Sequence, residues 1–276
     1  MRKSSAAALT LFGALLGGGC AHGRNYDAPN GPRFMGGVVP ERPAQQVLRV
    51  VSFNVNYAWA LHEVASVLQQ TPLLQGADLV LLQETDLAST EWLAAALGRA
   101  YVYVPAMWHP VSRRDYGNAI LSAWPIIESA KILLPHLGRW RQNRRVAAAA
   151  TVCIGSTPVR VYATHLGTMT EMGPGARREQ LVTVLDDADD FSIAIVGGDF
   201  NSGGVAKAAV DRGYSWPTEG RGSTRGPWAV DHVLVRGATA LEAGVVSITP
   251  GVSDHRPIWV AIRLDNANSS APCTPT

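Results

Sequence analysis

The sequence predicts an α/β protein in which sheets and helices pack in layers. Apolar runs rich in β-branched residues recur along the chain, and several are continuous rather than alternating, as is typical of strands buried on both faces. Helical patterns lie between some of these runs. The chain has 276 residues, of which 47% are apolar and 17% charged, which allows a sizeable core and excludes a disordered chain.

The predicted elements follow one another in mixed order. Strands are predicted at residues 47–55, 77–83, 101–105, 119–124, 146–154, 159–165, 193–197, 229–235, 244–248 and 258–264. Helices are predicted at residues 61–70, 89–100, 175–188 and 203–212. Pro174 stands directly before the third helix, a position that suits the first helical turn. This order indicates a layered α/β sandwich, although periodicity alone does not choose among several such folds.

The first nineteen residues are predicted to be a signal peptide. Arg2 and Lys3 precede a short apolar run at residues 6–16, which is too short to span a bilayer permanently. The ending Leu-Gly-Gly-Gly-Cys resembles a bacterial lipoprotein signal. That resemblance implies an exported protein that is held on a membrane of the cell envelope through lipidated Cys20. Ordinary secretion with a free Cys20 is the alternative.

The remaining chain is predicted to form one domain. Residues 20–46 are interrupted by Pro and Gly and are expected to be a flexible tether, residues 47–265 a single folded unit, and residues 266–276 a polar tail. Cys153 lies in an apolar run and Cys273 in the tail. They could pair in an oxidising compartment, but the sequence does not indicate whether they do.

Charge and cysteine content exclude several classes. Without residues 1–19 the 24 basic residues fall by two to 22, against 22 acidic residues, so the chain is formally neutral. A neutral chain is not a generic polybasic nucleic-acid binder. Three cysteines are too few for a disulfide scaffold or a zinc cluster.

Polar residues that can do chemistry gather at the ends of the predicted strands. They are Asn54, Glu84, His165, Asp199, Asn201, Asp231, Asp254 and His255. Loops at strand ends are where α/β folds place ligands. Carboxylates and carboxamides are hard oxygen ligands that suit Mg²⁺ or Mn²⁺. Neither a glycine-rich nucleotide loop nor a Gly-x-Ser-x-Gly elbow occurs. Metal-assisted hydrolysis of a phosphoester is the reaction class that fits.

Short motifs that carry these residues resemble those of one superfamily. In chain order they are Ser52-Phe53-Asn54, Gln83-Glu84, Gly117-Asn118-Ala119-Ile120-Leu121-Ser122, Thr164-His165-Leu166, Gly198-Asp199-Phe200-Asn201, Asp231-His232 and Ser253-Asp254-His255-Arg256-Pro257. Together, over residues 47–264, they resemble the endonuclease/exonuclease/phosphatase superfamily. The resemblance implies the deoxyribonuclease I-like fold, a four-layered α/β sandwich of two packed mixed sheets flanked by helices. It also implies divalent-metal-dependent phosphoester hydrolysis.

The same resemblance implies roles for individual residues. It places metal binding on Asn54, Glu84 and Asp254, catalysis on His165, Asp199, Asn201, Asp231 and His255, and phosphate binding on Asn118, Asn201 and His255. Structural alternatives stay open for some of them: Asn54 as a turn cap, Asn118 as a turn residue, and Asp231 as the partner of an arginine. Arg139, Arg141, Arg144 and Arg145 form a basic stretch that is expected to be a solvated loop; contact with an anionic substrate is the alternative, for which Arg145 is the best placed of the four.

Several substrates remain open at this stage. The first expectation is an exported phosphodiesterase that uses Mg²⁺ or Mn²⁺, with nucleic acid as one candidate substrate. The alternatives are a phospholipid or sphingomyelin head-group phosphodiesterase, an inositol phosphate phosphatase, and a catalytically inactive surface-binding lipoprotein. Trp108, Trp140, Trp216 and Trp228 fall in predicted loops, where Trp can stack on a base or enter a membrane interface, although half-buried loop anchors are commoner. The expected partners are a phosphoester and a membrane, the latter bound through Cys20, and the protein is expected to be a monomer.

Overall fold

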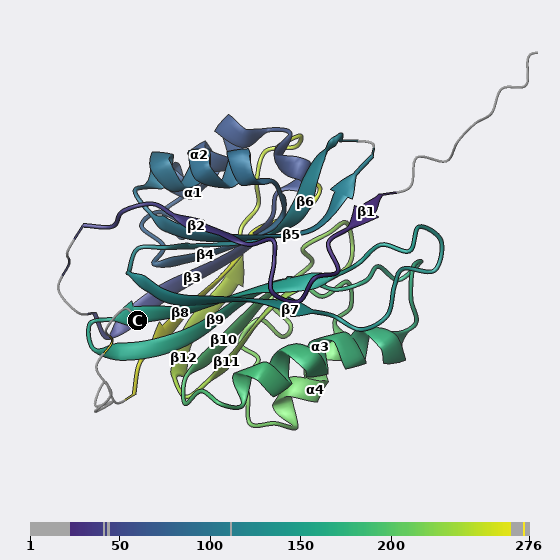
Figure 1. Cartoon of the computed structure of the whole chain (residues 1–276). Coiled ribbons are helices and arrows are strands. Elements are labelled where there is room, and N and C mark those ends of the chain that lie inside the picture. Colours follow the sequence, from purple (N-terminus) through teal and green to yellow (C-terminus); the bar gives the residue numbers. More distant parts are fainter. Residues whose placement is uncertain (1–22, 41, 43–44, 111, 266–272, 274–276) are drawn as a thin grey trace, which may run out of the picture.

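In the computed structural model, residues 23–40, 42, 45–110, 112–265 and 273 are described. Two mixed sheets pack face to face, and helices cover the outer face of each sheet (Figure 1). The predicted four-layered sandwich is therefore confirmed. The predicted signal peptide, Cys20 and most of the polar tail lie outside the described residues.

The larger sheet has eight strands. Their order is β1 (Arg24–Asn25), β5 (Ala100–His109), β6 (Arg114–Ser122), β4 (Leu79–Thr85), β3 (Val47–Asn54), β13 (Ile258–Arg263) and β12 (Thr239–Val245), with β2 (Phe34–Gly36) also paired to β5. Only the β3–β4 pair is parallel, so both of these strands deliver their carboxyl ends to one end of the sheet.

The smaller sheet has five strands. Their order is β11 (Asp231–Arg236), β10 (Ala194–Asp199), β9 (Thr157–His165), β8 (Val146–Ile154) and β7 (Ile126–Leu133). Its only parallel pair is β9–β10, which ends with Asp199 opposite His165. Each sheet therefore contributes one pair of parallel strand ends.

Helices form the two outer layers. The larger sheet carries η1 (Asn56–Ala58), α1 (Leu61–Gln70) and α2 (Leu87–Leu97), and the smaller carries α3 (Pro174–Ala188), η2 (Gly204–Ala206) and α4 (Lys207–Val210). Local sequence explains the ends of α2. The Asp86 side chain accepts a hydrogen bond from the Ser89 amide at 2.7 Å, and Gly98 adopts the left-handed conformation that ends many helices. In α3, Pro174 occupies the first turn as predicted.

Three apolar cores hold the layers together. Within β3, Val50 packs between the sheets whereas its neighbour Val51 packs against the helix layer. A third core, which includes Phe200, joins the smaller sheet to α3 and η2. Successive strand residues point to opposite faces, so a strand covered on both faces must be apolar throughout. This explains the continuous apolar runs in the sequence.

Every predicted strand lies on an observed strand, although bounds shift, and one strand of the smaller sheet was missed. β7 contains Glu128 and Lys131 and forms an edge of that sheet. Edge strands need less continuous apolar character than central ones, so the run did not stand out.

Part of the predicted flexible tether is folded onto the domain, which corrects that prediction. β1 and β2 pair with β5, and the Lys131 ammonium donates to the carbonyls of Tyr26 and Gly31 at 2.6 and 2.8 Å. Without these strands β5 would be an edge with unpaired amides and carbonyls. That gain outweighs the Pro and Gly interruptions on which the prediction rested.

At the other end of the sandwich, a disulfide joins Cys153 of β8 to Cys273, across 120 residues of sequence, with the two Cα atoms 5.8 Å apart. The sequence left this pairing open. Within the described residues, no helix combines the length and apolar character that crossing a bilayer requires.

Candidate active site

Most of the predicted site residues meet where the parallel strands end. Asn54 is the last residue of β3, and Glu84 lies in β4, the parallel neighbour of β3. His165 and Asp199 end β9 and β10. Because the two sheets pack face to face, these ends converge, and Asn54 reaches across from one sheet to Asp199 in the other.

The backbone around the site adopts conformations that most residues avoid. Glu84 is a bulge in β4 with φ of 58°, and Asn201 has φ of 51°. Positive φ in non-glycine residues costs energy and often occurs at functional sites. Position 198 accommodates only glycine, because a Cβ on any other residue there would lie 1.8 Å from the Thr164 carbonyl oxygen. These constraints fix where Glu84 and Asp199 point.

One side of the site is acidic. The Asn54 amide nitrogen donates to Glu84 Oε1 and to Asp199 Oδ2, both at 3.1 Å. Burial raises the pKa of Glu84, opposed by the Asn54 hydrogen bond and by the charge of Arg145. Burial, together with the charge of Asp231, raises the pKa of Asp199 to about 7. The carboxyl groups of Glu84 and Asp199 thus share Asn54 as a neighbour, and the nearby positive charge of Arg145 and His255 offsets only part of the effect of burial on their pKa values.

This acidic side fits a divalent cation. Glu84 and Asp199 provide carboxylate oxygens, which are the donor chemistry that Mg²⁺ and Mn²⁺ prefer, whereas Asn54 turns its amide nitrogen toward both and its oxygen toward the Asn56 amide, 3.1 Å away. A cation there would lower the raised pKa of both carboxyl groups by offsetting the charge that burial disfavours. We take Glu84 as the residue that would hold the metal, with Asp199 beside it; Asn54 would join them with its amide turned so that the oxygen faces the cation.

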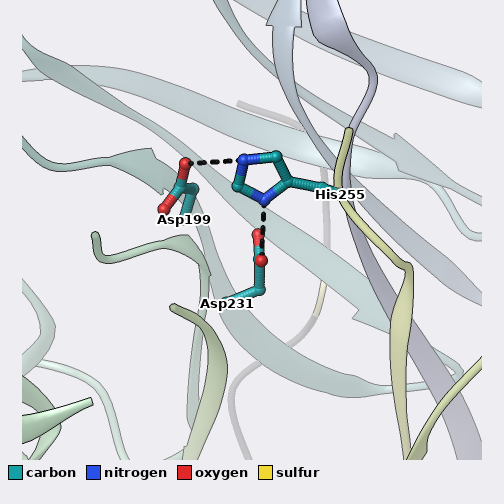
Figure 2. A group of neighbouring side chains, drawn as sticks. All are labelled: Asp199, Asp231 and His255. Atoms are coloured by element: carbon teal, nitrogen blue, oxygen red, sulfur yellow. Dashed lines mark hydrogen bonds and ion pairs between the residues drawn. The ribbon is translucent and has the colours of Figure 1, made fainter. Parts of the chain in front are cut away.

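The other side of the site is a row of three side chains, Asp231, His255 and Asp199, linked by one hydrogen bond and one ion pair (Figure 2). His255 Nδ1 lies 2.8 Å from Asp231 Oδ2, and His255 Nε2 lies 3.6 Å from Asp199 Oδ2. All three side chains are almost fully buried. Burial alone would lower the pKa of His255, but the charge and hydrogen bond of Asp231 outweigh it and raise that pKa to about 9.

The same three residues bring potential metal-ligand atoms within 4.8 Å of one another. A metal is nevertheless better placed on the Asn54 side. The His255–Asp231 separation is that of a hydrogen bond, and a His255 that keeps its proton at neutral pH has no lone pair to offer. Asp231 is therefore the hydrogen-bond partner of His255.

His165 is a second histidine beside Asp199, with the opposite character. Its Nε2 lies 3.4 Å from Asp199 Oδ2 and its Nδ1 lies 3.1 Å from the Tyr116 hydroxyl. Burial lowers the pKa of His165 well below its ordinary value, and the charges of Arg145 and His255 lower it further. A neutral and a protonated imidazole therefore flank one carboxylate.

Sequence reasoning missed Tyr116 and Glu171. Tyr116 directly precedes the Gly117-Asn118 motif, which was the only local signal for it. Arg145, which the sequence singled out, donates to Glu171 Oε2 at 2.9 Å and lies 3.4 Å from the Tyr116 hydroxyl. The buried arginine is thus held between a carboxylate and a phenol beside His165.

A pocket of about 380 Å³ opens over these groups. Glu84, Asp199, Asn201 and His165 line its floor, and Arg145 lies on its wall. Its remaining lining includes Asn56, Tyr57, Met107, His109, Tyr116, Trp140, Arg141, Asn143, Thr168, Thr170, Glu171, Arg225 and Asp254. The size and the mixture of cationic, hydroxyl and aromatic groups suit a phosphorylated organic molecule.

Three predicted residues make contacts that the sequence did not indicate. Asn118 is buried and donates to the Val146 carbonyl at 2.8 Å, so it ties the two sheets together and is not among the residues that line the pocket. Asp254 lines the pocket but is half-exposed. It forms an ion pair with Arg225 at 2.9 Å, although the sequence placed it with Glu84 among the metal ligands. Asn201 donates to the Leu166 carbonyl at 3.0 Å, while its backbone amide donates to Asp199.

A four-layered sandwich with buried carboxylates, a carboxamide and histidines at one end defines the class expected from the sequence motifs. The sequence profile of the Endonuclease/Exonuclease/phosphatase family matches residues 51–255, and the chain belongs to this family. The family consists of phosphoester hydrolases. Comparison with curated proteins found no match.

Solved structures share the fold at low sequence identity. A family protein from Bacteroides thetaiotaomicron is 18% identical, with 80% of this chain and 98% of that chain covered and a TM-score of 0.66. D. rerio TDP2, complexed with a single-strand DNA product, is 19% identical, with 79% and 100% covered and a TM-score of 0.64. A Bacteroides thetaiotaomicron mannosyl-6-phosphatase is 19% identical, with 78% and 99% covered and a TM-score of 0.62. Such likeness supports the fold and leaves the substrate open.

Proposed function

We propose that the protein is an exported, divalent-metal-dependent phosphodiesterase in which water attacks phosphorus. One observation carries this proposal. The carboxylate of Asp199 is contacted by Asn54 on one side and approached by His165 and His255 on the other, at the floor of the pocket. A buried carboxylate in this position can orient a water molecule and accept its proton.

Glu84, with Asn54 once its amide turns its oxygen inward, would hold Mg²⁺ or Mn²⁺, which would supply charge neutralisation at a phosphate oxygen. Asp199 orients the attacking water. His255, kept protonated by Asp231, donates to a phosphate oxygen and stabilises charge that develops there. His165 contacts the phosphate or the leaving group, with Arg145 adding positive charge from the pocket wall.

Export and lipidation of Cys20 are part of the proposal. The Cys153–Cys273 disulfide supports it, because structural disulfides persist in oxidising compartments such as the bacterial cell envelope. A lipid anchor on Cys20 would hold the enzyme on a membrane. This part is tested by labelling cells with radioactive palmitate. Label in the wild type and its loss in Cys20→Ser is the expected result, and an unlabelled wild type would mean ordinary secretion.

A lipid head-group phosphoester is the second candidate substrate, because the exposed Trp140 lies at the mouth of the pocket. An aromatic side chain at a pocket mouth suits an enzyme that meets its substrate at a lipid surface. Nucleic acid remains the first candidate substrate, and the test below separates the two.

The test is nicking of supercoiled plasmid with Mg²⁺, with EDTA, and by the His255→Ala variant. Trp92→Ala on α2, away from the pocket, is the matched control. Metal-dependent nicking by wild type and control, absent from His255→Ala, is the expected result for a nuclease. If no sample nicks plasmid, the same samples are assayed on phospholipid head groups. Activity there assigns the second substrate, and activity on neither would favour a binding protein without catalysis.

A further inference from the structure

The described chain begins beside a residue that lines the pocket. A Cβ on Gly23 would lie 2.5 Å from the terminal methyl of Met107, and Met107 lines the pocket. Cys20 is three residues before Gly23, a stretch that spans at most about 11 Å when fully extended. A lipid on Cys20 would therefore hold the pocket close to a bilayer, where the predicted 27-residue tether would have left it free.

The start of the chain is fastened to a loop of the pocket rim. Asn25 donates to the Gln142 carbonyl at 2.7 Å and accepts from the Arg144 amide at 3.0 Å. Arg144 also pairs with Asp27 at 2.7 Å. Figure 1 shows β1 at the side of the molecule from which the long loops after β7 and β9 extend. Hydrogen bonds and an ion pair thus join the first described residues to the loop after β7.

Two rim loops expose large apolar side chains. Trp140, in the loop after β7, is 73% exposed, and Met169, in the loop after β9, is 54% exposed. The two loops are bonded to each other, because the Arg139 amide donates to the Glu171 carbonyl at 3.0 Å. Trp140 itself lines the pocket, as do both neighbours of Met169. The apolar side chains therefore stand around the mouth.

The same rim carries cationic side chains. Arg139 and Arg141 flank Trp140 and are exposed. Among the residues described, neither arginine side chain takes part in an ion pair, whereas Arg144 and Arg145 of the same loop do. Exposed arginines beside Trp form the combination that binds the interface of an anionic bilayer.

We propose that this rim face, defined by Arg139, Trp140, Arg141 and Met169, docks on an anionic lipid bilayer and seats the mouth of the pocket against it. Trp140 and Met169 enter the interfacial region, and the two arginines contact lipid phosphates. The docking itself does not depend on the proposed function; only the hydrolysis that would follow in the pocket rests on it. It implies that the substrate phosphoester belongs to the membrane surface or is presented there.

The test measures partitioning onto vesicles without turnover. The chain from Ala21 onward contains every described residue and lacks the lipidation site, so binding reports the rim face alone. It is prepared with Asp199→Asn so that no lipid is hydrolysed. Co-sedimentation is measured with vesicles of phosphatidylcholine and with vesicles that also contain phosphatidylglycerol. The variants are Trp140→Ala/Met169→Ala, Arg139→Ser/Arg141→Ser and the control Trp92→Ala.

The expected result is partitioning onto the phosphatidylglycerol vesicles that falls about tenfold in each rim variant and is unchanged in the control. Circular dichroism of every variant checks that the fold persists. Absence of binding to either vesicle, or equal binding by folded rim variants, would overturn the docking proposal. Neither outcome touches the proposed hydrolysis, which the plasmid and head-group assays test separately.

Discussion

The two ends of the sandwich are built on opposite principles. At one end the part-buried Glu84 and the buried Asp199 and Asp231 bring carboxyl groups together on a backbone with residues in left-handed conformations. At the other end the buried carboxyl group of Asp78, directly before β4, is paired with Arg42 at 3.5 Å, and a covalent bond joins Cys153 to Cys273. Charge gathered away from water costs stability, whereas a crosslink adds to it. The comparison suggests that chemistry and stability are assigned to different ends of one domain.

The largest effect is expected at the active-site end. Asp199→Asn removes the carboxylate that orients water, so the hydrolysis rate should fall by about 10³-fold. The free energy of unfolding at pH 7 should not decrease, because a buried charge is removed and the Asn201 amide keeps an acceptor. Steady-state rates and urea unfolding measure the two quantities, with exposed Asp265→Asn as the control. If Asp199→Asn also lowered the free energy of unfolding, so that the rate loss followed from unfolding, chemistry and stability would not be separated between the two ends.

The opposite end should show the reverse pattern. Cys153→Ser opens the disulfide that closes 120 residues of chain, and this should lower the free energy of unfolding by about 2–5 kcal/mol. The hydrolysis rate at 25 °C should be unchanged, since the disulfide lies at the end of β8 remote from Arg145. Urea unfolding of wild type with and without a reductant provides the second measurement. A rate loss in folded Cys153→Ser would show that the ends are coupled.

A smaller effect on the hydrolysis rate is expected from replacing Asp231, which contacts His255 and does not line the pocket. Asp231→Asn removes the charge that raises the pKa of His255 to about 9, and burial then lowers that pKa. The hydrolysis rate should fall by about 10²-fold, less than for Asp199→Asn. NMR titration of the His255 ring separates this from a structural role. An unchanged His255 pKa in a folded Asp231→Asn protein would contradict the assignment.

The smallest effect is a pH dependence of stability in EDTA. The pKa of Asp199 is raised from 3.8 to about 7, so the native state holds that proton more tightly than the unfolded state. Stability should therefore fall as pH rises from about 4 through 7. His255, raised from 6.5 to about 9, adds stability that is complete below 6.5 and lost as pH rises through 9. Urea unfolding midpoints measured from pH 4 to pH 9 test both contributions. In Asp199→Asn the midpoint should vary less with pH below 7 than it does in the wild type.

The sequence predicted what depends on short runs of residues. Continuous apolar runs revealed the central strands, and motifs at their ends revealed Asp199 and His255, because strand ends of a layered sheet converge by geometry alone. It did not predict partners that are distant in sequence. Lys131 binds Tyr26 across 105 residues, and Cys153 meets Cys273 across 120. Such contacts leave no local pattern.

Individual roles were harder to predict than positions. Asn118 carries the expected motif, yet its amide holds the two sheets together. Glu171 belongs to none of the motifs, and its side chain accepts hydrogen bonds from Arg145 and Asn143, which are distant in sequence. A residue's place in a motif fixes where its backbone lies, whereas the direction of its side chain depends on neighbours from other strands.

The most direct test of the account is the Mg²⁺ dependence of phosphodiester hydrolysis. Initial rates on bis(p-nitrophenyl) phosphate are measured against Mg²⁺ concentration for the wild type and for Glu84→Gln, with EDTA samples beside them. We predict a saturable rise with Mg²⁺ in the wild type, no turnover in EDTA, and at least about tenfold more Mg²⁺ for half-maximal rate in Glu84→Gln. Hydrolysis by the wild type that continues at full rate in excess EDTA would contradict the assignment of this site.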